Sequence, residues 1–159
     1  MTVDALLDGW EAAWSSRDAG SFAELCSPRL HYEDPLTPEP LEGPQELGTH
    51  VERLWDAFPD ARIEKTGQRL IDGRFAAAPC RLLGSHRGAL GGLPPSDRSV
   101  VVHAVFYCEV ENDRLLRVRG FCDLYDAGVQ LGVLPEHGSL GERALLMLRG
   151  YGLRGRAAR

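Results

Sequence analysis

The first sixty residues hold three stretches in which apolar residues recur at helical spacing, at about residues 3–16, 21–27 and 43–58. Such spacing places apolar side chains on one face of a helix. In the first stretch both tryptophans, including Trp14, belong to this face and should point inward. A short strand is expected at residues 29–33. The chain is therefore predicted to open with three helices and one early strand.

Two of the expected helices begin with a capping box, in which a Ser and a Glu three residues later satisfy free backbone N–H groups. Ser21 and Glu24 begin the second helix in this way, and Ser139 and Glu142 begin a helix near the C-terminus. This last helix is expected to run to about Gly150. Its apolar face needs a surface to cover, which is the pocket, the outside of a sheet or a partner subunit.

From residue 61 to residue 125 the pattern changes to strand-like runs with period-two alternation. The four runs are residues 61–71, 74–87, 98–110 and 114–125. Asp72-Gly73 and Asn112-Asp113 are turns of the hairpin type between neighbouring runs. Helices followed by an antiparallel meander indicate an α+β fold, with the helices on one face of a curved sheet. A sheet closed by helices in this way encloses a pocket.

Length and composition limit the classes of protein to consider. A chain of 159 residues with 43% apolar and 26% charged residues is the size and composition of one globular domain. It contains no apolar run near the roughly 18 residues of a membrane span, and its N-terminus lacks the pattern of a secretory signal. We therefore expect a cytoplasmic protein. The net charge of −5 argues against a nucleic-acid-binding groove.

Cysteine and histidine spacing gives no sign of a metal site. The four cysteines form no C-x-x-C pair, so buried free thiols are expected rather than zinc or disulfides. The histidines are scattered, with no H-x-x-x-H spacing. A basic tail from Arg154 to Arg159 is expected to be a frayed end.

Candidate chemistry gathers near the end of the last strand-like run. On a strand, Arg119, Phe121, Asp123 and Tyr125 share one face, because side chains alternate. A carboxylate among aromatic rings is disfavoured in its charged form, which raises its pKa and suits it to transfer protons near neutral pH. The alternative is that Asp123 only ends the strand and caps the following turn.

The preceding run supplies a possible partner for Asp123. His103, Val105 and Tyr107 share one strand face, and a hairpin about Asn112 would bring His103 close to Asp123. An imidazole there could relay protons or orient an enolate oxygen, or it could be an ordinary core histidine. Arg119 would either bind an acidic group of the substrate or pair with Asp123.

Three further residues have two possible placements. His86, at a glycine-flanked strand end, suits either a pocket rim or the solvent-exposed surface. His31 and Tyr32 are adjacent on the early strand, so only one of them can face inward. Trp14 belongs to the core by its spacing, and the pocket wall is a second possible placement. The residues expected to bind substrate are Trp14, His86, Val105, Tyr107, Arg119, Phe121 and Tyr125.

Three stretches resemble the SnoaL-like polyketide cyclase family of the NTF2-like superfamily. Residues 41–60 are similar to its G-x-x-x-(L/I) helix ending in F-P-D. Residues 84–98 are similar to G-T-H-x-G followed by G-x-P-P-T-G-R. Asp123 lies seven residues before Gln130-Leu131-Gly132, which is the spacing of the family's W-D-x-x-G-x-x-x-Q-L-G ending. The three stretches occur in the family's order and together span about residues 41–135.

The resemblance implies an NTF2-like cone over residues 1–135, with a buried pocket, and a C-terminal helical extension over residues 136–159. It also implies a homodimer that needs no metal or organic cofactor and acts on a hydrophobic small molecule. In the cyclase members, the Asp that matches Asp123 is the general acid/base of an intramolecular aldol ring closure. A histidine of the preceding strand often joins the pocket, and His103 matches it by position.

The match also has departures. Cys122 stands where the family usually has Trp, and Asp126 replaces an apolar residue, so the pocket floor and the substrate should differ. The expected activity is cyclisation or isomerisation of a hydrophobic carbonyl compound. The alternatives are a hydrolase or hydroxylating relative on the same cone and a non-catalytic small-molecule-binding module, because one fold can carry many functions.

Overall fold

The computed structural model describes residues 1–150, and within them the chain forms five helices and seven strands. In chain order these are α1 (Val3–Ser16), α2 (Ser21–Leu25), β1 (Cys26–Glu33), β2 (Leu41–Glu42), α3 (Gly43–Ala57), β3 (Arg62–Lys65), β4 (Leu70–Asp72), β5 (Phe75–Ser85), β6 (Ser99–Glu111), β7 (Arg114–Cys122), α4 (Leu124–Gln130) and α5 (Leu140–Leu148). The expected basic tail lies outside the described residues.

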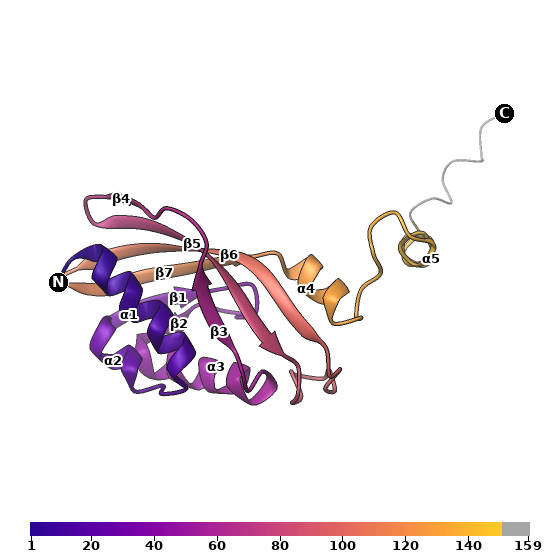
Figure 1. Ribbon diagram of the computed structural model, residues 1–159, viewed down its shortest axis with the longest axis horizontal. Helices are drawn as coiled ribbons and strands as arrows, with labels where there is room; N and C mark the ends of the chain where they lie inside the picture. The colour runs from indigo at the N-terminus through magenta and orange to yellow at the C-terminus, as the bar shows by residue number, and fades with distance from the viewer. Residues whose placement is uncertain (151–159) are drawn as a thin grey trace.

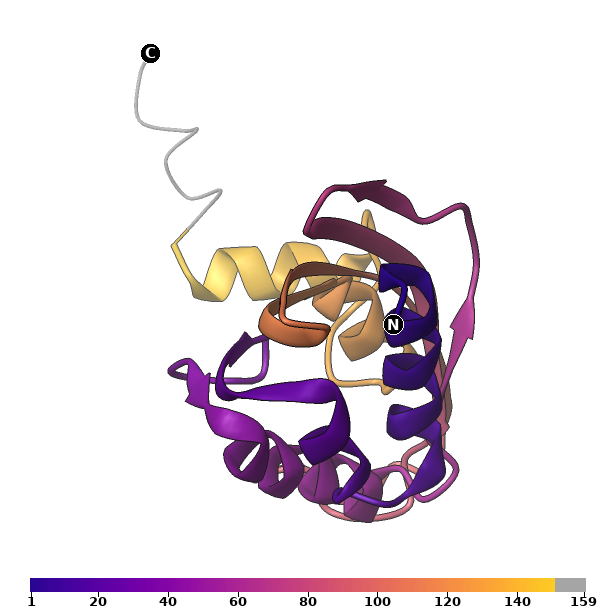
Figure 2. The ribbon, with the colours of Figure 1, turned by 90° about the vertical axis from the view of Figure 1, so that its left-hand side faces the viewer.

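The strands form one sheet in the order β2-β1-β7-β6-β5-β3, and β4 also pairs with β5. Helices α1, α2 and α3 lie on one side of this sheet, as Figures 1 and 2 show. The predicted α+β fold with three N-terminal helices on a curved sheet is confirmed.

Two details of the sheet differ from the prediction. The run at residues 61–71 is two short strands, β3 and β4, which pair with different parts of β5. Strand β1 pairs with β7 in parallel, whereas the prediction was an antiparallel sheet throughout. The reason is topological: β1 enters the sheet after two helices, so it need not follow the hairpin direction of the later strands.

The helix starts follow local chemistry with one exception. The Thr2 side chain accepts a hydrogen bond from Ala5 N at 3.2 Å and so caps α1. In α3, Pro44 occupies the first turn, where its missing N–H costs nothing. The capping box predicted for α2 is wrong: its N-cap is Gly20, and the Ser21 hydroxyl donates to Asp18 instead.

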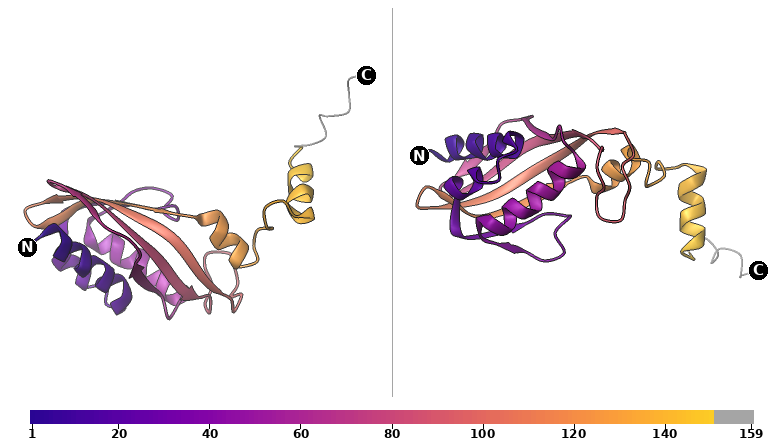
Figure 3. Two further views of the ribbon diagram at one scale, coloured as in Figure 1. Left: turned by 45° about the horizontal axis from the view of Figure 1, so that its top comes forward. Right: turned by 90° about the horizontal axis from the view of Figure 1, so that it is seen from below.

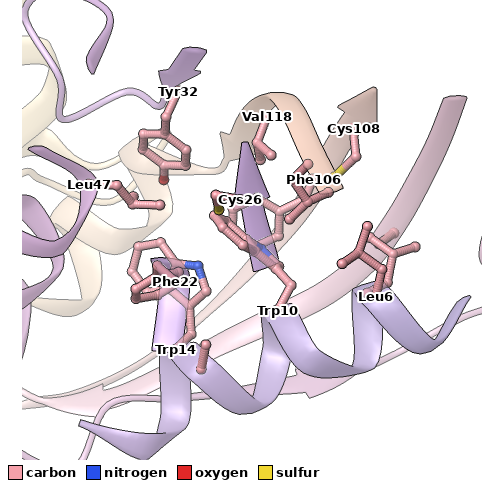
Figure 4. Packing of buried hydrophobic residues seen from close by; sticks show 14 of the residues in the cluster. Leu6, Trp10, Trp14, Phe22, Cys26, Tyr32, Leu47, Phe106, Cys108 and Val118 are labelled. Atoms are coloured by element: carbon pink, nitrogen blue, oxygen red, sulfur yellow. The ribbon is translucent and has the colours of Figure 1, made fainter. Parts of the chain in front are cut away.

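Trp10 of α1 is the centre of the core. Its side chain is fully buried and packs edge-on against Phe22, Trp14 and Phe106, with ring centroids 5.3–5.9 Å apart. Figure 4 shows these rings between α1 and the sheet, with Tyr32 close by. Aromatic residues contribute the largest buried areas of any side chains, so this cluster is the main source of stability for the helical layer.

Strand β6 separates the inside of the fold from the outside. Its even-numbered residues from Val100 to Cys108 are buried and face the helices, and its odd-numbered residues from Val101 to Tyr107 are exposed on the opposite face. We call this second surface the outer face. Even-numbered residues of this part of β6 can therefore contact the interior, and odd-numbered residues cannot.

The chain after β7 leaves the sheet. Helix α4 packs against the end of β6, and α5 stands apart from the rest of the protein, as Figures 1 and 3 show. The capping box of α5 is confirmed, since Ser139 Oγ accepts from Glu142 N at 3.1 Å. No residue of α5 is buried. The helix therefore covers neither the pocket nor the sheet of its own chain, which leaves a partner subunit among the three expected surfaces.

Within residues 1–150 no helix combines the length and the apolar character needed to cross a membrane.

Candidate active site

A pocket with a cavity volume of about 160 Å³ lies between the inner face of the sheet and helices α1, α3 and α4. Arg62 is the one charged residue of the lining among the described residues, and the others are apolar side chains or glycine. The pocket is therefore suited to a predominantly hydrophobic ligand.

The pocket walls come from distant parts of the sequence. Trp14 lines it from α1 and Trp55 from α3, and the Trp55 Nε1–H donates to Trp14 O at 2.9 Å, which fixes one ring against the other helix. Cys122 contributes its thiol from the end of β7. Burial raises the pKa of this thiol, and the negative charges of Asp34 and Asp123 raise it further, so the thiol stays neutral near pH 7.

Three polar side chains meet next to this pocket. Asp34 Oδ2 accepts a hydrogen bond from Tyr32 Oη at 2.7 Å and lies 2.8 Å from His50 Nε2. Asp34 Oδ1 accepts from the backbone N–H groups of Leu36 and Thr37, at 2.7 and 3.1 Å. The Asp34 and His50 side chains are only 11% and 13% exposed. We call Tyr32, Asp34 and His50 the polar triad.

The position of the triad follows from the strand and helix that carry it. Tyr32 and Asp34 are two residues apart at the end of β1, so they share its inner face. His50 lies one helical turn before Leu54 on α3, and Leu36 follows Asp34 by two residues. Both leucines line the pocket. The triad is therefore near the pocket through these two neighbours, although none of its own three residues is part of the lining.

Hydrogen bonding keeps Asp34 ionised. Burial works against the charged form, but the hydrogen bonds from His50 and Tyr32 outweigh it and hold the pKa of Asp34 below its ordinary value. A carboxylate whose two oxygens already accept four hydrogen bonds is a poor proton acceptor. Its chemical effect is to orient His50 and to stabilise the imidazolium form, as the carboxylate of a catalytic triad does.

His50 retains one nitrogen for chemistry. With Nε2 donating to Asp34, Nδ1 carries the lone pair of the neutral ring. Within residues 1–150 Nδ1 has no hydrogen-bond partner, and it is not among the fully buried unpaired atoms. An imidazole oriented by a carboxylate with one accessible nitrogen is the usual form of a general base.

The Asp34 hydrogen bonds predict a specific dependence of stability on pH. Because folding lowers the pKa of Asp34 from 3.8, its contribution is complete above about pH 5 and is lost as the pH falls through the folded pKa. Asp34→Asn should therefore lower the free energy of unfolding near pH 7 by about 1–3 kcal/mol, and the gap to the wild type should close toward pH 2. Urea unfolding at several pH values measures this. A gap that is constant with pH would contradict the role of the charge.

The predicted catalytic residues lie elsewhere. His103 and Asp123 are indeed neighbours on adjacent strands, since Asp123 N donates to His103 O at 3.2 Å. Both side chains, however, are exposed on the outer face. The Asp123 carboxylate accepts from Asp126 N at 2.9 Å and caps α4. The placement of Asp123 among pocket rings is thus corrected, and the alternative, a strand end that caps the next turn, is what the structure has.

Five predicted substrate-binding residues share this outward placement or lie beyond the strand. Val105, Tyr107 and Phe121 are 37–52% exposed on the outer face. Arg119 pairs with Glu33, with Nε 2.7 Å from Oε1, and not with Asp123. Tyr125 belongs to α4, because β7 ends at Cys122, and its hydroxyl donates to Pro135 O at 2.8 Å.

His86 is neither at the pocket rim nor in solvent. Its ring is fully buried and stacks on Phe58, which lines the pocket, with centroids 5.2 Å apart. Ser96 N donates to His86 Nδ1 at 3.1 Å, so the ring anchors the loop between β5 and β6. Of the predicted substrate-binding residues, Trp14 is the one that lines the pocket.

Potential metal ligands are not gathered at one point in the described part of the chain. Within residues 1–150 no group of three or more His, Cys, Asp or Glu side chains is arranged to hold a metal ion. The polar triad contributes one imidazole and one carboxylate, which is fewer than the three protein ligands typical of a catalytic zinc site.

Comparison with solved structures places the fold among known proteins. TsrD from Streptomyces laurentii is 22% identical over 83% of this chain and 96% of its own, with a TM-score of 0.73. AclR from Streptomyces galilaeus is 20% identical over 92% of this chain and 91% of its own, with a TM-score of 0.73. A protein from Catenulispora acidiphila with a ketosteroid isomerase-like fold, solved in complex with trimethylamine, is 14% identical over 83% of this chain and 95% of its own, with a TM-score of 0.72. At these identities the likeness shows the shared fold.

Comparison of sequences identifies the family. A search of curated proteins finds no match. The model of the SnoaL-like polyketide cyclase family matches residues 4–131, which include the polar triad, all strands and α4. The chain therefore belongs to the SnoaL-like polyketide cyclase family.

Proposed function

We propose that this protein is an enzyme that binds a hydrophobic carbonyl compound in the apolar pocket and catalyses its enolisation, leading to ring closure or isomerisation. The observation that carries the proposal is the His50–Asp34 pair, with 2.8 Å between His50 Nε2 and Asp34 Oδ2, near a pocket whose lining is almost entirely apolar. An apolar site with a few well-placed polar groups is typical of small-molecule enzymes.

In the proposed reaction His50 Nδ1 takes a proton from a carbon next to a carbonyl group. The resulting imidazolium is stabilised by the ionised Asp34. In a cyclisation, the enolate carbon attacks a second carbonyl of the same substrate, and His50 returns its proton to the new alkoxide oxygen, so that no proton is gained or lost overall. A positioned base of this kind contributes roughly 10²–10⁴-fold. The pocket contributes further by holding the two carbonyl groups of a folded substrate near each other.

This proposal moves the catalytic role from Asp123 to His50 and keeps the reaction class implied by the family. Asp123 stays a candidate that experiment can separate from His50, because the two side chains lie on different elements and Asp123 is solvent-exposed. His103 would act only together with Asp123, its cross-strand neighbour.

The reaction can be tested without the natural substrate. 2-Tetralone is an apolar bicyclic ketone whose α-protons exchange with deuterium in D₂O, and NMR follows the exchange. We expect the wild type to accelerate this exchange over buffer and Ala127→Phe, which adds a ring to the pocket lining, to lose most of the acceleration. Ala12→Phe, on the exposed side of α1, is the matched control. Binding of 2-tetralone by tryptophan fluorescence without accelerated exchange would favour the alternative of a binding module.

A homodimer built on the outer face is part of the proposal. Val101, Val105, Tyr107 and Phe121 form a strip that is 37–52% exposed, and contiguous exposed apolar strips of this kind mark interfaces. Phe121→Asp should raise the dimer dissociation constant on the order of a hundredfold, because each copy loses a buried ring.

Size-exclusion chromatography with light scattering over a dilution series measures this dissociation. Val133→Asp in the turn after α4, where Val133 is 52% exposed, is the control and should leave the dimer unchanged. An equal effect of both substitutions, or a wild type that is monomeric at high concentration, would contradict the proposed interface.

A further inference from the structure

One edge of β6 is open beside the pocket. The pairing of β6 with β7 begins at Ala104, opposite Cys122, and the last backbone bond across this edge runs from Asp123 N to His103 O. On its other edge β6 continues to pair with β5 as far as Ser99. The backbone N–H and C=O of Val101 therefore have no strand partner on the β7 side, within the described residues.

The side chain of Gln130, the last residue of α4, takes the place of the missing strand. Its Oε1 accepts from Val101 N at 2.8 Å, and its Nε2 donates to Val101 O at 2.9 Å. The amide thus reproduces the paired donor and acceptor of a neighbouring strand. Because the amide oxygen faces an N–H and the amide nitrogen faces a C=O, its orientation is determined by its partners.

Asp126 holds the amide in this orientation. It lies one helical turn before Gln130, and its Oδ2 accepts the second N–H of Gln130 Nε2 at 2.6 Å. Asp126 is also the residue that departs from the apolar character usual in the family at this position. A carboxylate here gives this chain a polar support for Gln130.

Few other interactions fasten this part of the chain. Within residues 1–150, and apart from the capping bonds that Asp126 N and Ala127 N donate to Asp123, the two bonds between Gln130 and Val101 are the only hydrogen bonds that join residues 124–150 to the rest of the protein. No ion pair does so. Helix α4 has no fully buried residue. It nevertheless supplies one wall of the pocket through Leu124 and Ala127, and Leu131 follows directly.

We infer that Gln130 is the latch that holds α4 against the open edge of β6 and so closes the apolar pocket, with Asp126 as the residue that orients the latch. Release of the two bonds to Val101 lets α4 move away and opens the pocket at this wall. The rates of ligand entry and exit then depend on how often the bonds between Gln130 and Val101 are broken. This holds whichever reaction takes place in the pocket. A segment with few buried contacts and one pair of hydrogen bonds is the kind that opens locally without global unfolding.

The test uses two substitutions of the latch. Gln130→Met keeps the side-chain length and removes both bonds, and Gln130→Glu also places a negative charge next to Val101 O and Asp126. Gln45→Glu, an exposed glutamine in the first turn of α3, is the matched control. Two quantities are measured: hydrogen exchange of the Val101 amide and of residues 124–131, and the dissociation rate of the apolar dye 8-anilinonaphthalene-1-sulfonate by stopped flow.

We expect both latch variants to speed the exchange of the Val101 amide and the dissociation of the dye on the order of tenfold or more, since two net hydrogen bonds are lost. The midpoint of global unfolding should stay close to that of Gln45→Glu. The inference is overturned if Gln130→Met matches the control in both rates. It is equally overturned if exchange rises throughout the core together with a lower unfolding midpoint, because Gln130 would then support the whole fold and not α4. Should Gln130→Glu fail to fold, Gln130→Met alone decides between these results.

Discussion

Replacing His50 by Gln should lower the rate of enzyme-catalysed α-proton exchange of 2-tetralone by about 10²–10⁴-fold, because the amide keeps a donor toward Asp34 but has no basic nitrogen. The hydrogen bond between His50 and Asp34 spans 2.8 Å, and the glutamine side chain can reach the same carboxylate. The fold and the pocket should therefore persist, and the dissociation constant of 2-tetralone, measured by tryptophan fluorescence, should change little. A large loss of rate with unchanged binding identifies a group that acts in the transition state.

Asp34→Asn should lower the same exchange rate through its effect on His50. The amide oxygen can still accept from the backbone, but the NH2 group in place of Oδ2 cannot accept from Tyr32 and no longer stabilises the imidazolium form of His50. We expect a smaller loss of rate than for His50→Gln, and little change in the dissociation constant of 2-tetralone. Equal losses of binding and rate in both variants would show that the triad supports the pocket structurally and does not take part in proton transfer.

Replacing Trp10 by Ala should lower the free energy of unfolding by about 3–5 kcal/mol. The indole is fully buried and contacts the rings of Phe22, Trp14 and Phe106 with centroids 5.3–5.9 Å apart. Its removal leaves a cavity that these large rings cannot fill without moving off their rotamers. Guanidinium unfolding followed by circular dichroism measures the loss, which is a large fraction of the stability of a domain of this size.

Trp10→Phe is the informative comparison. The indole Nε1–H of Trp10 is buried and has no hydrogen-bond partner among the described residues. The phenyl ring removes this unpaired donor, so part of the cost of the lost volume is offset, and the loss should stay below about 2 kcal/mol. A cost for Trp10→Phe as large as for Trp10→Ala would mean that the indole nitrogen has a partner, such as an ordered water.

The sequence was sufficient to place most of the helices and strands along the chain, but not to predict every strand pairing. Helical spacing around Trp10 and Trp14, and hairpin turns such as Asn112-Asp113, are local signals that depend on few residues, and the structure has the corresponding elements. The parallel pairing of β1 with β7 was not predicted. That contact joins residues almost ninety positions apart, such as Cys26 and Leu115, and no local pattern reports it.

The sequence also showed which residues share a face, but not which face is inside. His103, Val105 and Tyr107 do lie on one side of β6, and this side is the outer face. The amino-acid composition of each face of β6 indicates which face is buried. The alternate positions of β6, from Val100 to Cys108, are all apolar, whereas the set with His103 and Tyr107 contains polar groups. A purely apolar alternation identifies the core side of a strand.

The polar triad was missed for a different reason. Tyr32 and Asp34 are close in sequence, but His50 comes from another element, and only the packing of α3 on β1 brings its ring to the carboxylate. Asp34 directly follows the strand predicted at residues 29–33 and precedes Pro35, a place where an Asp commonly ends a strand. Asp34 and His50 each come a few residues before a residue that lines the pocket, Leu36 or Leu54. This relation can be recognised only after the structure has shown where the pocket is.

The most direct test of the account compares His50→Gln with Asp123→Asn in the same deuterium-exchange experiment on 2-tetralone. Asp123 is exposed and caps α4, whereas His50 lies near the pocket and is bonded to an ionised carboxylate. The account predicts that His50→Gln loses about 10²–10⁴-fold of the catalysed rate and that Asp123→Asn keeps most of it. Loss of the catalysed rate in Asp123→Asn, with His50→Gln still active, would contradict the account and return the base to Asp123.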